Sequence, residues 1–182
     1  MTLLTEGQKA PSFTGVDQNG KKHKLADWKG KKVVLYFYPE DGTPTCTVQA
    51  CNLRDNHALL RKHGFEVVGV SPDDVAKHKK FEDKHQLPFV LLADPERKVI
   101  EQYGVWGEKQ LYGRKYMGLL RTTFVIDEKG VIRKIFLKPK SKEHAAEIIA
   151  AWDALRLSRS FIGHILRLVA YDRNLPFLIS PL

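Results

Sequence analysis

Short apolar runs alternate along the chain with stretches in which apolar residues recur at helical spacing. The apolar and β-branched runs predict strands at 12–16, 33–38, 65–70, 89–92, 122–127 and 131–136. Helical spacing predicts helices over 45–63, from 71 to about 86, over 96–103 and over 141–154. The order βαβαβ, then a hairpin, then a helix predicts an α/β fold with parallel central strands, an antiparallel hairpin at one side and flanking helices.

Turn and capping residues place the boundaries of these elements. Asn19-Gly20 predicts a hairpin turn near the N-terminus, and Gly64 is expected to cap the helix over 45–63. Ser71, followed by a proline and two aspartates, is expected to be the N-cap of the next helix. Gly104 ends the helix over 96–103, and the glycine- and aromatic-rich stretch 105–119 is predicted to be a loop.

Both cysteines lie in one stretch, directly after the most apolar predicted strand. Cys46 falls on the first turn of the following helix, at the carboxyl end of a sheet strand, where α/β proteins place their active sites. Unpaired N–H groups and the positive end of the helix dipole favour thiolate there, and thiolate is the reactive form. The alternative is that Cys46 is a small buried hydrophobic residue. The proline before it and the helix after it favour a nucleophile.

The second cysteine, Cys51, follows five residues later in the same predicted helix. Five helical residues turn through roughly 500° and rise about 7.5 Å, so the two Cα atoms would lie about 8–9 Å apart. A disulfide needs Cα atoms within about 7 Å. The thiols therefore cannot pair in an intact helix, which disfavours an inert structural disulfide and favours a thiol that is oxidised and then resolved after local unwinding.

Composition is that of one soluble globular domain. The 182 residues are 43% hydrophobic and 28% charged, and no apolar run approaches the length of a membrane span. The first six residues are too short and acidic for a signal peptide. Two cysteines do not make a disulfide scaffold, so we expect a reducing, cytoplasmic setting.

A net charge of +9 raises the possibility of nucleic-acid binding. The lysine pairs at 21–22, 31–32 and 79–80 fall in different predicted elements, without interleaved aromatic residues on one face. A binding surface needs clustering, so we expect solvated surface and no nucleic-acid partner. The seven histidines show no ligand spacing with one another or with the cysteines, so no metal site is expected.

The cysteine stretch resembles a known family. Pro39-x-x-x-Thr43-x-x-Cys46 is similar to the active-site signature of the peroxiredoxins, and its wider context resembles their bacterioferritin comigratory protein branch, also called PrxQ. The resemblance covers about residues 5 to 154 and implies a thioredoxin-like fold, a central mixed β-sheet flanked by helices. The stretches that carry it are YFYPEDGTPTCTVQACNLRD, GVWGEK at 104–109, RTTFVIDEKG at 121–130 and GQKAPSFTGVDQNGKKHKLADWKGK near the start.

The resemblance also implies roles for individual residues. Cys46 would be the peroxidatic cysteine that becomes a sulfenic acid, and Cys51 the cysteine that resolves it as a disulfide. Thr43 would hydrogen-bond the thiolate and the peroxide, Pro39 would shield the pocket, and Arg121 would lie beside the thiolate. Thioredoxin or a similar dithiol protein would reduce the disulfide. No metal or organic cofactor and no membrane contact are expected, and the branch is often monomeric.

The physical chemistry of peroxide cleavage supports the roles of Cys46 and Arg121, whereas those of Thr43 and Pro39 rest mainly on the resemblance. The reaction needs a thiolate and donors for the oxygen that acquires charge. Arg121 offers fixed N–H donors and a permanent charge, although by itself it could equally be a surface arginine at a strand edge. Two positions depart from the branch pattern: Thr45 stands where glycine is common, and Gln49 where many members have glutamate. Neither removes a catalytic group.

The tail from 155 to 182 extends past the end that members of this branch usually have. It carries apolar residues at helical spacing and four arginines against one aspartate, which is +3 of the total +9. It is predicted to be an amphipathic helix that packs on the domain or on a partner, one that rests on a membrane surface, or a non-native extension from an altered reading frame or from cloning. None of these would change the chemistry at Cys46.

The leading hypothesis is thus a peroxidase that reduces hydrogen peroxide and small organic hydroperoxides. A thiol–disulfide oxidoreductase is the second hypothesis, disfavoured because such enzymes use Cys-x-x-Cys rather than a spacing of five. A third is a redox-sensing protein that uses the same switch with slow peroxide turnover. A basic nucleic-acid-binding module is the fourth.

Overall fold

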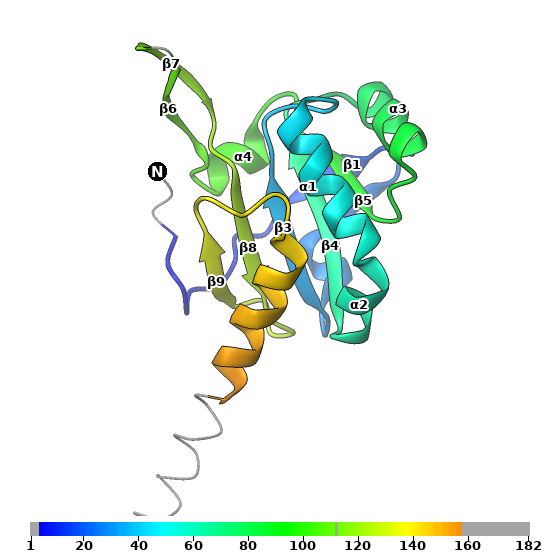
Figure 1. The fold of residues 1–182 in the computed structure, drawn as a ribbon, viewed down its shortest axis with the longest axis vertical. Helices are drawn as coiled ribbons and strands as arrows, with labels where there is room; N and C mark the ends of the chain where they lie inside the picture. Colours follow the sequence, from blue (N-terminus) through cyan, green and yellow to red (C-terminus); the bar gives the residue numbers. More distant parts are fainter. Residues whose placement is uncertain (1–3, 112, 158–182) are drawn as a thin grey trace, which may run out of the picture.

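The computed structural model describes residues 4–111 and 113–157, and within them seven strands form one twisted sheet in the order β2-β1-β5-β4-β3-β8-β9 (Figure 1). Strands β3, β4 and β5 are parallel, and the remaining pairs are antiparallel. The predicted α/β fold with a mixed sheet is confirmed. The strands are β1 Thr14–Asp17, β2 Lys22–Lys24, β3 Lys32–Phe37, β4 Phe65–Ser71, β5 Val90–Ala93, β8 Thr122–Ile126 and β9 Ile132–Phe136.

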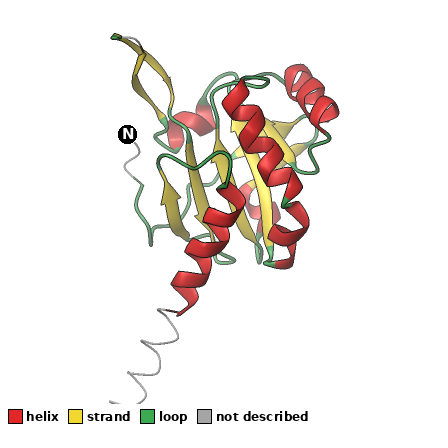
Figure 2. Cartoon of the chain, in the orientation of Figure 1, coloured by secondary structure: helices red, strands yellow, loops and turns green. Residues whose placement is uncertain are grey.

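Helices cover both faces of this sheet. Figures 1 and 2 show α1, α2 and the last helix on one face, with α3 near the β1–β5 edge. Side chains of α4 pack into the core on the opposite face. The helices are η1 Leu25–Trp28, α1 Pro44–Asp55, α2 His57–Lys62, α3 Val75–His85, α4 Lys98–Gln102 and a last helix over 144–157, which carries no label.

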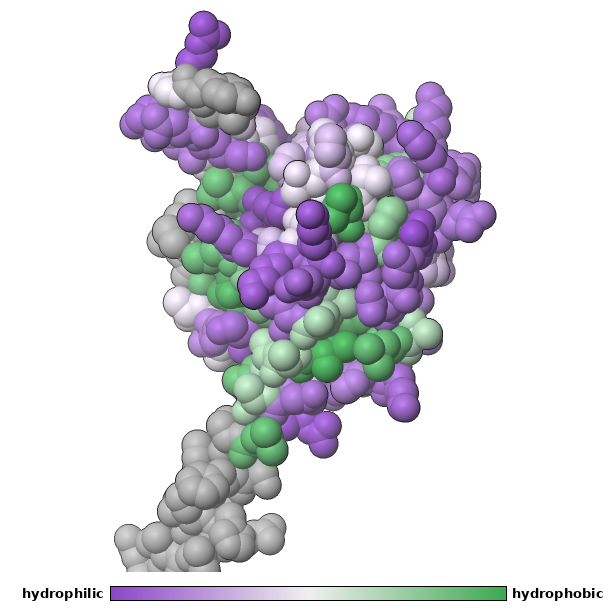
Figure 3. All heavy atoms as spheres, viewed as in Figure 1, coloured by the Kyte–Doolittle hydropathy of each residue, from purple (hydrophilic) through white to green (hydrophobic). Residues whose placement is uncertain are grey.

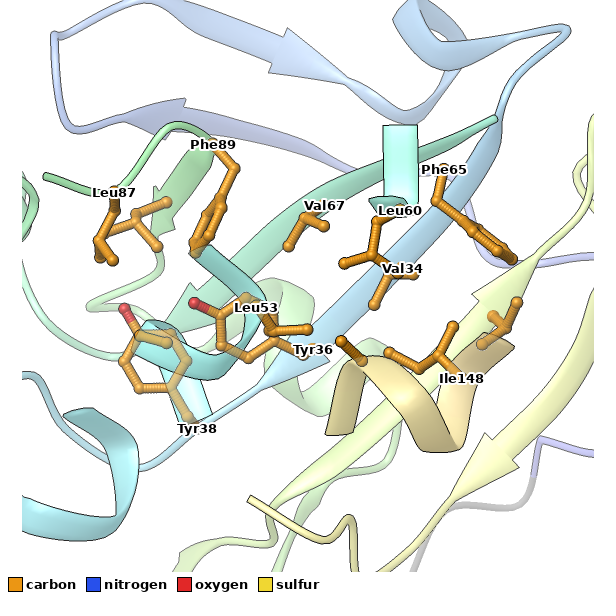
Figure 4. Close-up of a cluster of buried hydrophobic side chains, with 14 of the residues drawn as sticks. Val34, Tyr36, Tyr38, Leu53, Leu60, Phe65, Val67, Leu87, Phe89 and Ile148 are labelled. Atoms are coloured by element: carbon orange, nitrogen blue, oxygen red, sulfur yellow. The ribbon is translucent and has the colours of Figure 1, made fainter. Parts of the chain in front are cut away.

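Strand β3 supplies side chains to two hydrophobic cores, one on each face of the sheet. Because successive side chains of a strand point to opposite faces, its residues divide into two alternating sets. Val34 and Tyr36 pack against Leu53 of α1 and its neighbours (Figure 4). Val33, Leu35 and Phe37 pack on the other face, with Ile100 of α4. Burial on both faces explains why this strand is one continuous apolar run.

The helix expected over 45–63 is divided at Asn56, which ends α1 and precedes α2. The Asn56 backbone has φ −103° and ψ 11°, and its side-chain amide donates to the Asn52 carbonyl oxygen over 2.9 Å. Asparagine side chains compete with the helical hydrogen-bond ladder in this way, which accounts for the break. Gly64 follows α2 with φ +81°, as expected of a residue that ends a helix.

The predicted N-cap Ser71 is wrong: α3 begins three residues later, with Asp74 as its N-cap. Asp74 Oδ1 accepts from the Lys77 backbone N–H over 2.7 Å. Ser71 is instead the last residue of β4, where it pairs with Ala93 of β5. Its hydroxyl accepts from the Asp73 backbone N–H over 3.0 Å. The serine thus caps a turn between strand and helix.

The stretch 105–119 is a hairpin, and the prediction of a loop there is wrong. It forms β6 Trp106–Leu111 and β7 Arg114–Leu119, with Gly113 in the turn at φ +79°. Figure 1 shows this hairpin projecting from the body of the fold. Most of the β7 residues are exposed, so no apolar alternation marks the strand.

The described surface is largely polar. Figure 3 shows a mainly hydrophilic face with small hydrophobic areas on the side that carries α1 and the last helix. No helix among the described residues is long and apolar enough to cross a membrane. The last helix continues past 154, where the thioredoxin-like domain over 1–154 was expected to end, through residue 157. The rest of the predicted C-terminal extension lies outside the described residues.

Candidate active site

Cys46 is the third residue of α1, as its position after β3 predicts. Thr43 is the N-cap residue, with extended backbone angles of φ −70° and ψ 148°, and Pro44 is the first helical residue. Proline suits that position because its fixed φ is helical and its missing N–H would have no intrahelical partner. The Cys46 side chain is buried, with 2% of its surface exposed, and lies where the N–H groups of the first turn are unpaired.

Arg121, the residue just before the neighbouring strand β8, reaches Cys46. Strand β8 pairs antiparallel with β3, and Thr122 faces Phe37, so Arg121 arrives beside the carboxyl end of β3. Its Nη2 donates to Cys46 Sγ over 3.0 Å. A guanidinium at this distance places permanent positive charge and a fixed donor against the sulfur, which stabilises negative charge there. The structure therefore brings Arg121 and Cys46 together.

Gln49 completes this contact and was not among the expected catalytic residues. It is fully buried, and its Oε1 accepts from Arg121 Nη1. Its Nε2 has no hydrogen-bond partner among the described residues. A spacing of three residues puts Gln49 on the same side of α1 as Cys46, which was the available sequence signal. Because the Gln49 amide is neutral, this contact holds the Arg121 guanidinium in place without neutralising its positive charge.

Thr43 and Pro39 lie in the loop that joins β3 to α1. The Thr43 hydroxyl donates to the Glu40 carbonyl oxygen over 3.1 Å, so in this structure it is held by its own loop. Pro39 follows the end of β3 and is half-buried. Both residues lie near the start of α1, where the sequence motif places them. The roles expected for them remain predictions.

A buried polar network anchors this loop, and sequence reasoning did not find it. Asp41 Oδ1 accepts from the Tyr38 hydroxyl over 2.7 Å, and Oδ2 lies 2.6 Å from His78 Nδ1. His78 Nε2 lies 3.2 Å from the Leu92 carbonyl oxygen. Burial, followed by the nearby Tyr36 and Asp41, raises the pKa of Tyr38 well above its usual value, so the phenol keeps its proton. The network joins the loop between β3 and α1 to α3 and β5.

Cys51 lies on α1 with Cys46, as predicted. Among the described residues both cysteines are free thiols, and Cys51 is partly exposed. Regular helix geometry over five residues separates their Cα atoms by about 8–9 Å, beyond the reach of a disulfide. Cys51 Sγ lies 3.8 Å from His85 Nδ1 on α3. Within the described residues, no group of three histidine, cysteine or acidic side chains could hold a metal ion.

Comparison with known proteins shows the family of the chain. Residues 6–135 match the family model described as "AhpC/TSA family". The chain is 48% identical to Peroxiredoxin Bcp of Bacillus subtilis strain 168 over 79% of this chain and 91% of the relative. It is 43% identical to Peroxiredoxin Bcp of Escherichia coli K12 over 84% and 97%.

Solved structures show the same likeness. A structure of the Xanthomonas campestris bacterioferritin comigratory protein, from work on its alkyl peroxide reduction activity, is 30% identical, with a TM-score of 0.73 over 78% of this chain and 90% of that chain. A structure of BcpB from Mycobacterium tuberculosis is 32% identical, with a TM-score of 0.72 over 82% and 96%. The protein therefore belongs to the AhpC/TSA family, in its bacterioferritin comigratory protein (PrxQ) branch, and is a peroxiredoxin, a peroxidase of the oxidoreductase class.

Proposed function

We propose that this peroxiredoxin reduces hydrogen peroxide and small organic hydroperoxides to water and alcohols through Cys46, with Cys51 as the resolving cysteine and thioredoxin as the reductant. The observation that carries the proposal is the 3.0 Å contact between Arg121 Nη2 and Cys46 Sγ at the first turn of α1. A charged donor on a sulfur at a helix N-terminus is the environment that a nucleophilic thiolate requires.

In the first step the Cys46 thiolate attacks one oxygen of the peroxide. The S–O bond forms as the O–O bond breaks, Cys46 is oxidised to a sulfenic acid, and the leaving oxygen takes a proton to become water or an alcohol. Arg121 donates to the sulfur and to the oxygen that acquires charge. In this proposal the Thr43 hydroxyl turns from the Glu40 carbonyl oxygen toward the peroxide, and Pro39 shields the pocket.

In the second step the Cys51 thiol attacks the sulfenic acid sulfur. The S–S bond forms, the S–O bond breaks and water leaves. Because both residues lie on one helix, the first turns of α1 must unwind before the sulfurs can meet. A dithiol protein then reduces the disulfide by thiol–disulfide exchange.

Peroxide consumption in the presence of thioredoxin, its reductase and NADPH tests the proposal. We expect Cys46→Ser to be inactive, and Cys51→Ser to form a sulfenic acid once without turning over. Peroxide turnover by Cys46→Ser would show that the nucleophile is another group. A wild-type protein that is oxidised once and not recycled would favour a redox sensor with slow turnover, or a dithiol other than thioredoxin.

A further inference from the structure

Cys51 faces a histidine that the first step of the reaction does not use. Its Sγ lies 3.8 Å from Nδ1 of His85, at the end of α3. The His85 ring packs against the ring of Phe81 one turn earlier, with centroids 5.0 Å apart and planes at 67°. Arg54, one turn after Cys51 on α1, donates from Nη1 to the His85 carbonyl oxygen over 2.7 Å. The end of α3 is thus held against the middle of α1.

The charges around His85 favour a neutral ring. Burial, followed by the positive charges of Lys84 and Arg54, lowers the pKa of His85 below its usual value. Lys84 precedes His85 on α3, whereas α1 presents Cys51 and Arg54, the latter paired with Asp55. A neutral imidazole whose Nδ1 faces a thiol can accept the thiol proton.

We propose that His85 is the general base for the resolving step and takes the proton of Cys51 as this thiol attacks the Cys46 sulfenic acid. This inference rests on the proposed function of Cys51. The S–S bond forms while the S–O bond of the sulfenic acid breaks, Cys46 sulfur is reduced and Cys51 sulfur is oxidised. The hydroxide that leaves receives the proton from the His85 imidazolium, so that water is released and the base is restored.

The anchoring of α1 keeps Cys51 beside this base. The Asn52 side chain donates from Nδ2 to the Lys142 carbonyl oxygen over 2.8 Å and accepts the Ala145 backbone N–H on Oδ1 over 2.9 Å. Together with Arg54, it ties the part of α1 beyond Cys51 to the start of the last helix and to the end of α3. The segment that unwinds is therefore the one before Cys51, and Cys46 moves toward a stationary Cys51.

Single-turnover oxidation of His85→Gln tests the proposal. The reduced protein is mixed with one equivalent of hydrogen peroxide, free thiols are alkylated at set times, and mass spectrometry follows sulfenic acid and disulfide separately. At pH 7 we expect disulfide formation to slow by about a hundredfold, the lower end of general-base effects. At high pH the two rates should converge, because hydroxide from the solvent then removes the thiol proton without the help of a histidine.

His63→Gln, at the end of α2, is the matched control and should leave disulfide formation unchanged. A His85→Gln variant that forms the disulfide at the wild-type rate would overturn the assignment. Equal slowing at every pH would also overturn it, since a purely structural role does not depend on thiol ionisation. Undiminished turnover by Cys51→Ser would instead refute the proposed function, because Cys51 would then not be the resolving cysteine.

Discussion

Arg121 donates from Nη2 to Cys46 Sγ over 3.0 Å, although 75 residues separate the two in the chain. The antiparallel pairing of β8 with β3 creates this contact, and Gln49 holds the other guanidinium nitrogen. The arginine thus bridges two residues of the same helical turn. A substitution that keeps the positive charge but loses the planar group therefore separates the effect of geometry on the reaction of Cys46 from the effect of charge.

Replacing Arg121 by lysine should slow Cys46 oxidation. Lysine keeps the positive charge but cannot donate to Cys46 and Gln49 together from a fixed planar group. We expect the second-order rate constant with hydrogen peroxide, measured by stopped-flow, to fall by about a hundredfold, the lower end of the effect of losing one preorganised donor. Arg61→Lys, at an exposed ion pair with Glu66, is the control. An unchanged rate in Arg121→Lys would show that charge alone suffices.

Asp41→Ala should destabilise the fold through the buried network beneath the loop between β3 and α1. The alanine removes both carboxyl oxygens, which now serve Tyr38 and His78. A buried polar group left without its partner costs about 1–3 kcal/mol in unfolding free energy, which urea denaturation measures. Tyr38→Phe removes only the hydroxyl and should cost about 1 kcal/mol. Equal stability of Asp41→Ala and wild type would contradict a stabilising role for this network.

Asn52 variants should separate the two hydrogen bonds that anchor α1. Asn52→Asp keeps an acceptor for the Ala145 N–H and loses the donor to the Lys142 carbonyl oxygen, whereas Asn52→Ala loses both. Each such hydrogen bond contributes about 0.5–1.5 kcal/mol. In thermal or urea unfolding we expect the stability order wild type, Asn52→Asp, Asn52→Ala. An Asn52→Ala protein as stable as wild type would rule out the anchor.

The unfolding free energy should decrease at acidic pH because of Asp127, which lies in the turn of the β8–β9 hairpin. Burial alone would raise the pKa of Asp127, but hydrogen bonds from the Val131 and Lys129 backbone and from Arg133 outweigh it and lower the pKa. A carboxyl whose pKa is lowered on folding stabilises the fold above its unfolded pKa of about 3.9 and loses that contribution as pH falls through the folded value.

Urea denaturation of wild type and Asp127→Asn between pH 7 and pH 2 measures this dependence. The stability advantage of wild type should be constant from pH 7 to about pH 5 and should shrink below about pH 4. An advantage that persists undiminished at pH 2 would mean that Asp127 stabilises the turn without its charge.

Much of this fold could be predicted from patterns of neighbouring residues in the sequence. The apolar run of β3, the hairpin β8–β9 and the start of α1 at Cys46 all follow from residues adjacent in the chain, because side-chain periodicity and capping are local properties. The family motif around Cys46 likewise lies within a few neighbouring residues. It predicted membership in the peroxiredoxins, which the comparisons confirm.

Other features depended on contacts between distant segments. The break of the helix at Asn56 depends on a side chain that bonds the backbone, and the β6–β7 hairpin lacks the apolar alternation that would mark its strands. His78 meets Asp41, and His85 meets Cys51, only because α3 lies against the end of the sheet and against α1. The sequence by itself determined which residue is the candidate nucleophile and what kind of sheet carries it. Only tertiary structure decided which donors, anchors and bases surround that nucleophile, because sheet register and helix packing bring together side chains that no local periodicity relates.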